Sequence, residues 1–419
     1  MKVVLISKYE KTGGAAIACN RLVQALNKFE IPARMLVQES SPVLSPFILS
    51  TSYTKLKKLT NYARFLYEIL IFLRHERSRQ VRFMFSIANT GEDISQHPVL
   101  KDTEIIHLHW INHGFLSIKS LKKIFALKKP VVWTLHDMWA FTGGCHYAIE
   151  CTNYKSSCGE CPYLRNPNKK DLSHKVWVKK KKILENQKLK IVAISNWLKE
   201  CASSSSLLAG KDIIVIPNPI DHNKYNPSDK KTAKKELGLN EEKKYILFGA
   251  ANIRNILKGF PFFLDALKKL NTNTETSCQY EVLLYGKATA EVIPLIPFVT
   301  HDFAYLESEM KIISLYNAAD VFVIPSLQDN LPNTILESFA CGTPVVGFNS
   351  GGIGEIIDHE KNGYLAEYKS SSDLAHGIQW VLENEDYQHL SQHARQKVIT
   401  EYSEKVIAEK YRLLYQQLI

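Results

Sequence analysis

Short apolar runs rich in β-branched residues alternate along the whole chain with segments that are apolar at helical spacing. In the first half, the runs that predict strands cover residues 2–7, 104–110, 130–137, 190–195 and 212–218. In the second half, they cover residues 244–250, 281–286, 320–326 and 343–348. Helical patterns lie between them, for example at residues 15–29, after a Gly-Gly pair, and at residues 261–270. Strands that alternate with helices predict parallel sheets covered on both faces, so the expected fold class is α/β.

The length and one polar stretch predict two domains. The chain has 419 residues, and a typical domain has about 150. Residues 216–238 are rich in Pro, Asn and Lys and contain no apolar run, so we place the boundary there. We expect an N-terminal domain over residues 1–218, a C-terminal domain over 219–400, and a terminal helix at 401–419 that packs back on the first domain. Two such domains are expected to leave a cleft between them, with ligands beyond the carboxyl ends of the strands.

Composition and charge narrow the class of protein. Hydrophobic residues make up 45% and charged residues 23%, which is ordinary for a soluble globular protein. The formal net charge of +11 suits an anionic partner, such as nucleotide phosphates, nucleic acid or an acidic membrane surface. A basic solvated surface explains it equally well. No signal peptide or spanning segment is visible, so we expect a cytoplasmic protein with reduced cysteines.

The stretch "DNLPNTILE" brings two carboxylates close to a helix start. Asp329 follows the predicted strand at 320–326, and Glu337 lies one turn inside the helix that begins near Asn333. Free backbone N–H groups at a helix start favour an anion such as phosphate. Carboxylates accept hydrogen bonds from vicinal hydroxyls, so the pattern points to a nucleotide sugar. The alternative is that Glu337 only offsets the helix dipole and Asp329 caps a turn.

Together with the following "ACGTPVVGFNSGGIGEII", this stretch resembles the signature of glycosyltransferase family 4, retaining enzymes of the GT-B fold. The resemblance implies two Rossmann-like domains, with donor binding in the C-terminal one and acceptor binding in the N-terminal one. It implies that Asp329 holds the donor sugar and Glu337 the ribose diol. The other donor-binding residues that it implies are Asn330, Leu331, Pro332, Asn333 and Thr334, with amides at the phosphate. Asp329 replaces the usual Glu and is one methylene shorter.

The resemblance also implies a positive clamp on the diphosphate, because the family uses no metal there and the leaving group develops negative charge. Lys258 and Gly259 match the Lys-Gly that opens a helix in the family. The usual Arg beside the preceding Gly is missing, and Arg254 is expected to supply its charge. Solvated cations at a helix start are the alternative for both.

Two further motifs of the N-terminal half fit the same family. Gly13 and Gly14 follow the first strand, where glycines let a backbone approach a ligand closely; a tight turn is the alternative. His136 ends a strand and, by resemblance, contacts the donor sugar near the reacting carbon, with Asp137 orienting the loop. A structural histidine is the alternative. His109 also ends a strand, and we expect it on the acceptor side.

The function that the resemblance implies is transfer of a hexose from a UDP- or GDP-sugar to a polyprenyl-diphosphate-linked or oligosaccharide acceptor in cell-surface polysaccharide synthesis. Retention would follow from same-side substitution, with no catalytic cofactor and no enzyme nucleophile. Two alternatives stay open: a nucleotide-sugar epimerase of the same fold, and a basic nucleic-acid-binding protein. We expect no nucleic-acid partner, because no interleaved basic and aromatic module is present.

Four cysteines lie together, at Cys145, Cys151, Cys158 and Cys161, with the spacing C-x5-C-x6-C-x2-C. Four thiolates within 17 residues can surround a tetrahedral zinc, whereas disulfides are disfavoured in a reducing cytoplasm. A family subgroup from bacterial exopolysaccharide and capsule clusters has a similar insert. We predict a structural zinc clip; reduced packing thiols are the alternative.

Residues 55–82 carry eight Lys or Arg and two Glu around an aromatic and aliphatic middle. This pattern is typical of a basic amphipathic helix on an anionic membrane. A helix packed on the first domain with a basic outer face is the alternative. Since the resemblance implies lipid-linked acceptors, we expect peripheral contact with the inner face of the plasma membrane.

Overall fold

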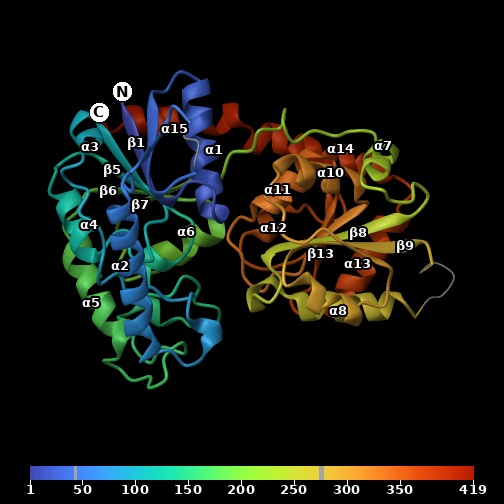
Figure 1. Ribbon diagram of the computed structural model, residues 1–419, viewed down its shortest axis with the longest axis horizontal. Coiled ribbons are helices and arrows are strands. Elements are labelled where there is room, and N and C mark those ends of the chain that lie inside the picture. The colour runs from blue at the N-terminus through green and yellow to red at the C-terminus, as the bar shows by residue number, and fades with distance from the viewer. Residues whose placement is uncertain (42–44, 273–277) are drawn as a thin grey trace. The chain divides into compact units, whose positions relative to one another are not determined.

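The computed structural model describes residues 1–41, 45–272 and 278–419. It divides into two compact units, each built around one parallel sheet. Unit 1 comprises Met1–Asn218 and Ile407–Ile419, and unit 2 comprises Pro219–Val406. The colours of Figure 1 separate them: unit 1 runs from blue to green and takes in the red C-terminal end, and unit 2 runs from yellow to red.

Unit 1 contains a seven-stranded sheet in the order β3-β2-β1-β4-β5-β6-β7. Every neighbouring pair is parallel. The strands are β1 Val3–Tyr9, β2 Ala33–Glu39, β3 Ile48–Ser50, β4 Ile105–Leu108, β5 Val131–Leu135, β6 Leu189–Ala193 and β7 Asp212–Val215. The strand order reverses between β1 and β4, and ligands of such sheets bind beyond the carboxyl ends at this switch point.

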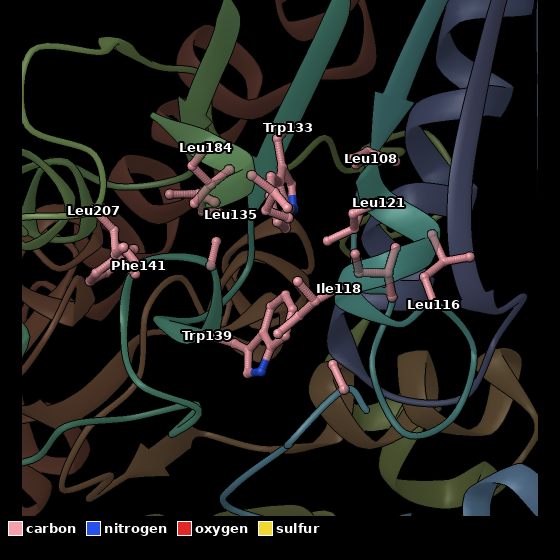
Figure 2. Close-up of a cluster of buried hydrophobic side chains, with 14 of the residues drawn as sticks. Leu108, Leu116, Ile118, Leu121, Trp133, Leu135, Trp139, Phe141, Leu184 and Leu207 are labelled. Carbon is pink, nitrogen blue, oxygen red and sulfur yellow. The ribbon is translucent and has the colours of Figure 1, made fainter. Parts of the chain in front are cut away.

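Helices cover both faces of this sheet. They are α1 Gly14–Lys28, α2 Lys55–Leu73, α3 Pro98–Asp102, α4 Ile118–Phe125, α5 Leu172–Leu184, α6 Asn196–Ser203 and α15 Glu404–Gln416. Because strand side chains alternate between faces, Val4 and Ile6 enter one core cluster and Val3 and Leu5 the other. Figure 2 shows part of the first cluster, which includes Trp133 and Trp139.

Unit 2 contains a six-stranded sheet in the order β10-β9-β8-β11-β12-β13, again parallel throughout. The strands are β8 Lys244–Asn252, β9 Tyr280–Lys287, β10 Thr300–Asp302, β11 Val321–Ile324, β12 Val345–Phe348 and β13 Gly363–Ala366. Its helices are α7 Lys230–Glu236, α8 Phe260–Leu270, α10 Glu309–Ala318, α11 Asn333–Ala340, α12 Ile353–Ile356, α13 Ser371–Glu383 and α14 Tyr387–Lys397. The order reverses between β8 and β11, so the loops after these strands are the expected ligand loops.

The structure confirms the predicted α/β class with parallel sheets. One prediction was wrong in extent: the helix expected over residues 55–82 ends at Leu73. After the helix, the backbone N–H of Arg77 donates to the carbonyl of Tyr163 and not to a carbonyl within α2. In the described ranges, no helix is both long enough and apolar enough to cross a membrane.

Candidate functional site

The loop between β11 and α11 holds the first predicted carboxylate. Asp329 is only 8% exposed, and its Oδ2 lies 2.6 Å from the Nζ of Lys258. Lys258 ends the short 3-10 turn Ile256–Lys258, which follows β8. The ion pair therefore joins the loops of β8 and β11, the two strands at the switch point of unit 2. The sequence predicted both residues at the donor site, and the structure brings them together.

Two glycines fix this loop by close backbone approach. A Cβ added to Gly259 would lie 1.8 Å from the carbonyl oxygen of Pro325, and one added to Gly351 would lie 1.9 Å from that of Asp329. Both glycines also adopt positive φ angles, of +67° and +58°. The N–H of Gly352 donates to the same Asp329 oxygen at 3.0 Å. The Lys-Gly and Gly-Gly motifs thus hold the Asp329 loop from both sides.

Glu337 is the second predicted carboxylate and is 7% exposed. The hydroxyl of Tyr316 donates to its Oε2 at 3.2 Å, and the hydroxyls of Tyr316 and Tyr285 lie 3.1 Å apart. Burial raises the pKa of both tyrosines, so their hydroxyls stay protonated. Glu337 is the fifth residue of α11, and the helix-dipole effect fades beyond the first turn. Offsetting the dipole is therefore a weak explanation for this acid.

Sequence reasoning missed Tyr285 and Tyr316, because their contacts join residues far apart in the chain. One signal was present at Gly249, which the sequence places at the end of the first strand of unit 2. A Cβ there would lie 1.9 Å from the ring of Tyr285. The glycine makes room for the tyrosine that, through Tyr316, positions Glu337.

The remaining predicted donor residues lie between Asp329 and the first turn of α11. Asn330, Leu331 and Asn333 are buried, and Pro332 is the residue before the helix. Thr334 follows in the first turn. Their backbone groups therefore surround the start of α11, where a phosphate is favoured.

Arg254 does not join this group. Its side chain is 64% exposed and forms an ion pair with Glu291. The structure thus places only Lys258, of the two predicted cations, against Asp329.

In unit 1, the predicted glycine loop connects β1 to α1. Gly13 has a φ of +89° and precedes α1, which begins at Gly14. A Cβ at Gly13 would meet no atom within 4 Å, so the backbone angle, and not crowding, requires glycine here.

His136 and Asp137 directly follow β5 and belong to a network of polar side chains. The Nε2 of His136 lies 2.9 Å from the Nδ1 of His109, at the end of neighbouring β4. Burial lowers the pKa of His136 to about 4, so its imidazole is neutral at neutral pH. This geometry suits a group that donates or accepts one hydrogen bond and carries no charge.

Asp137 is anchored on several sides. Its Oδ2 lies 2.6 Å from the Nδ1 of His146 and accepts a hydrogen bond from the Nε1 of Trp110 at 2.9 Å. Burial acts to raise the pKa of Asp137, but the charge of His146 and these hydrogen bonds outweigh it and hold the pKa below its usual value. Such a fixed carboxylate fits the predicted role of orienting the loop. Sequence reasoning missed His146 as its partner.

A third histidine ties the terminal helix to the sheet. The Nδ1 of His107 lies 2.7 Å from the hydroxyl of Tyr415 on α15, and its Nε2 lies 2.7 Å from the Oγ1 of Thr134. Tyr411, one turn earlier, bonds Thr134 at 3.0 Å. These contacts place α15 on unit 1.

The four clustered cysteines line one cavity in unit 1, beside Tyr154 and Tyr163. All are free thiols, and burial raises the pKa of Cys158 to about 11 and that of Cys161 to about 12. In the part of the chain that the structure describes, no three or more His, Cys, Asp or Glu side chains are arranged so that they could hold a metal ion. The zinc clip stays a prediction.

Solved structures with the same architecture cover essentially the whole chain. Sucrose-phosphate synthase from Thermosynechococcus elongatus is 18% identical, with a TM-score of 0.70, and covers 100% of this chain and 98% of its own. HepE of Anabaena, solved with UDP and glucose, is 17% identical with a TM-score of 0.62 and full coverage of both chains. The fold is therefore that of the GT-B glycosyltransferases.

Matches to protein-family models show which family of glycosyltransferases the chain belongs to. The model described as Glycosyltransferase Family 4 matches residues 12–224, half of the chain, and the one described as Glycosyl transferases group 1 matches residues 229–397. The chain belongs to glycosyltransferase family 4.

Three curated relatives align with smaller parts of this chain than the solved structures do. N-acetyl-alpha-D-glucosaminyl L-malate synthase of Bacillus anthracis is 27% identical over 214 residues, which are 50% of this chain and 55% of the relative. The putative colanic acid biosynthesis glycosyl transferase WcaC of Escherichia coli is 25% identical over 281 residues, 64% and 63% of the two chains. An N,N'-diacetylbacillosaminyl-diphospho-undecaprenol alpha-1,3-N-acetylgalactosaminyltransferase of Campylobacter jejuni is 34% identical over 116 residues, 27% and 31%. The chain thus spans less than two thirds of the length of each of these three.

Proposed function

We propose that this protein transfers a hexose from a nucleoside-diphosphate sugar, with retention, to a lipid-linked or saccharide acceptor in cell-surface polysaccharide synthesis. One observation carries the proposal. Lys258 is held against the buried Asp329 at the switch point of unit 2, and a second buried carboxylate, Glu337, lies on the helix that follows. One cation suits the diphosphate of a nucleotide sugar, and two carboxylates suit the hydroxyl groups on either side of it.

Each group has a role in this proposal. Lys258 stabilises the negative charge that develops on the leaving diphosphate. Asp329 orients the Lys258 side chain and accepts hydrogen bonds from the donor sugar. Glu337 accepts hydrogen bonds from the ribose diol. The backbone N–H groups of Leu331, Asn333 and Thr334 bind a phosphate at the start of α11. The departing diphosphate takes the acceptor proton, so the protein supplies orientation and charge stabilisation and no nucleophile.

The names of similar proteins support the proposed donor nucleotide and the proposed acceptor. HepE structures contain UDP or UDP-glucose, which favours a UDP-sugar as the donor. The Campylobacter jejuni relative is named for a diphospho-undecaprenol acceptor, and the Escherichia coli relative for colanic acid. A lipid-linked acceptor also makes peripheral contact with a membrane part of the proposal.

Thermal unfolding with UDP, GDP and their sugars tests the donor. A ligand at 100 times its dissociation constant adds about 2.7 kcal/mol to the free energy of unfolding. We expect a clear rise in Tm with UDP and a smaller one with GDP. No rise with any nucleotide would contradict the donor site. Conversion of the donor sugar without an acceptor would favour the epimerase instead.

Structural zinc in the cysteine loop is a separate proposal. Four thiols on one cavity match zinc in number and type of donor, and metal binding can offset the raised pKa values of Cys145, Cys158 and Cys161 by stabilising the thiolates. The proposal rests on the donors around the cavity and not on their present spacing. We expect metal analysis to find about one zinc per chain, lost in the double variant Cys151→Ser/Cys161→Ser and kept in exposed Cys278→Ser. Metal-free wild type would make these thiols packing groups.

A further inference from the structure

Helix α2 of unit 1 exposes a stripe of apolar side chains to solvent and buries two polar ones against the protein. Leu59, Tyr62, Leu66 and Leu70 recur at helical spacing and are 64%, 58%, 38% and 59% exposed. A helix on a soluble domain normally buries such a stripe. Here the buried side chains are those of Asn61, Glu68 and Phe72, so two of the three are polar. Figure 1 shows α2 as one continuous helix of unit 1.

Buried polar contacts hold α2 in this orientation. The carboxylate of Glu68 accepts hydrogen bonds from the backbone N–H groups of Ala88 and Gly114, each at 2.8 Å. The amide of Asn61 donates to the Oγ of Ser52 at 2.8 Å. Breaking such contacts would leave buried polar groups unpaired, so α2 cannot simply rotate its leucines inward.

The backbone of α2 also packs tightly on the unit. A Cβ on Gly114 would lie only 2.7 Å from the backbone nitrogen of Phe65. The apolar stripe is therefore a fixed surface of a well-anchored helix and not the side of a frayed one.

We define the outer face of α2 by its exposed apolar residues: Leu56, Leu59, Tyr62, Leu66, Tyr67 and Leu70. Tyr53 and Phe83 are exposed nearby, at 72% and 58%. Of the large apolar side chains that are exposed in the described residues, eight thus lie between positions 53 and 83. A concentration of this kind marks an interaction surface.

Within residues 55–82, the exposed charged side chains all have one sign. Between residues 55 and 82 the only acids are Glu68 and Glu76, and both are buried. The exposed charged side chains in this stretch are Lys55, Lys58, Arg74, Arg77 and Arg79. Leucines and tyrosines bordered by lysines and arginines match the boundary between the acyl chains and anionic headgroups of a bilayer.

We infer that the outer face of α2 docks on an anionic lipid bilayer, with its apolar stripe at the acyl boundary and its basic residues on the headgroups. A second copy of the chain fits this face poorly, because pairing would oppose two basic rims. The inference deepens the proposed function, since a lipid-linked acceptor lies at such a surface, but vesicle binding itself needs no donor.

Co-sedimentation of the full chain with vesicles tests this inference. We expect binding to vesicles of phosphatidylcholine with phosphatidylglycerol, and much weaker binding to phosphatidylcholine alone. The triple variant Leu59→Ser/Leu66→Ser/Leu70→Ser is expected to lose roughly tenfold or more in affinity. The matched control is Leu413→Ser on α15, a leucine that is 54% exposed outside this face, and it should bind like wild type.

Charge-reversal variants give a second test in the same vesicle assay. Lys58→Glu/Arg74→Glu should weaken binding to the anionic vesicles and reduce its salt dependence, whereas exposed Lys119→Glu on α4 should not. Equal binding by the triple variant and wild type overturns the inference, as does absence of binding to anionic vesicles. A wild-type dimer that the triple variant dissociates would make a second copy the occupant and also overturn it. UDP-induced stabilisation, measured on the same variants, reports the donor site separately.

Discussion

Replacing Glu337 by Ala is expected to abolish stabilisation by UDP and to lower kcat/KM by about a hundredfold or more. The buried carboxylate can accept two hydrogen bonds from a ribose diol, and hydrogen bonds to charged groups contribute about 1.5–3 kcal/mol each. The measurements are thermal unfolding with and without UDP and initial rates of donor consumption. Because Tyr316 also bonds Tyr285, its hydroxyl keeps a partner in the variant, and the unliganded fold should persist.

Three comparisons make this result specific. Glu337→Gln keeps the size but loses the charge and one acceptor, so its UDP affinity should also fall. Exposed Glu385→Ala in unit 2 should behave like wild type. Tyr316→Phe leaves the acid but removes its orienting hydrogen bond of 3.2 Å, so a smaller loss, of about tenfold, is expected. UDP stabilisation that survives Glu337→Ala would remove Glu337 from the ribose site.

Replacing Lys258 by Ala is expected to lower kcat by about 100- to 1000-fold, while Tm falls little. The ammonium should act mainly on the leaving diphosphate, where its charge matters most in the transition state. Its ion pair with Asp329 is partly solvated, since the lysine side chain is 33% exposed. In the variant, the buried Asp329 keeps the hydrogen bond that the N–H of Asn330 donates to its Oδ1 at 3.0 Å, so the loss of stability should be smaller than the loss of activity. Activity and stability should therefore separate, as initial rates and thermal unfolding will show.

Lys258→Arg provides the matched control, because it keeps the positive charge and should keep part of the rate. A purely structural ion pair predicts the opposite pattern: Lys258→Ala and Asp329→Asn would destabilise the fold alike, and activity would follow Tm. Arg254→Ala is expected to have the weaker effect, because Arg254 pairs with Glu291 at the surface. Activity within tenfold of wild type in Lys258→Ala would argue against the clamp.

The central strands could be predicted from sequence because both their faces are buried. "KVVLIS", "KYILFGA" and "DVFVIPS" are nearly continuous apolar runs, which buried parallel strands require. Strands β3 and β10 have three residues each and lie at the sheet edges, where no such run is needed. Their pairing comes from neighbours that the local sequence does not reveal.

Helix α2 shows what the spacing of apolar residues in a sequence cannot predict. Its apolar stripe was visible in the sequence, but the side that it faces was not. The groups that anchor the opposite side, the N–H donors of Ala88 and Gly114, lie 20 and 46 residues from Glu68. The same limit applies at the donor loop, where Lys258 meets an aspartate 71 residues away while Arg254 turns to Glu291.

The return of the chain to unit 1 has a consequence for how the protein is made. Residues 407–419 complete unit 1, and Tyr415 supplies the partner of buried His107. On the ribosome, all of unit 2 is synthesised before these residues emerge. Part of one face of the unit 1 sheet therefore stays uncovered until α15 has been synthesised. During this time, a chaperone could bind the apolar face of the sheet that α15 later covers.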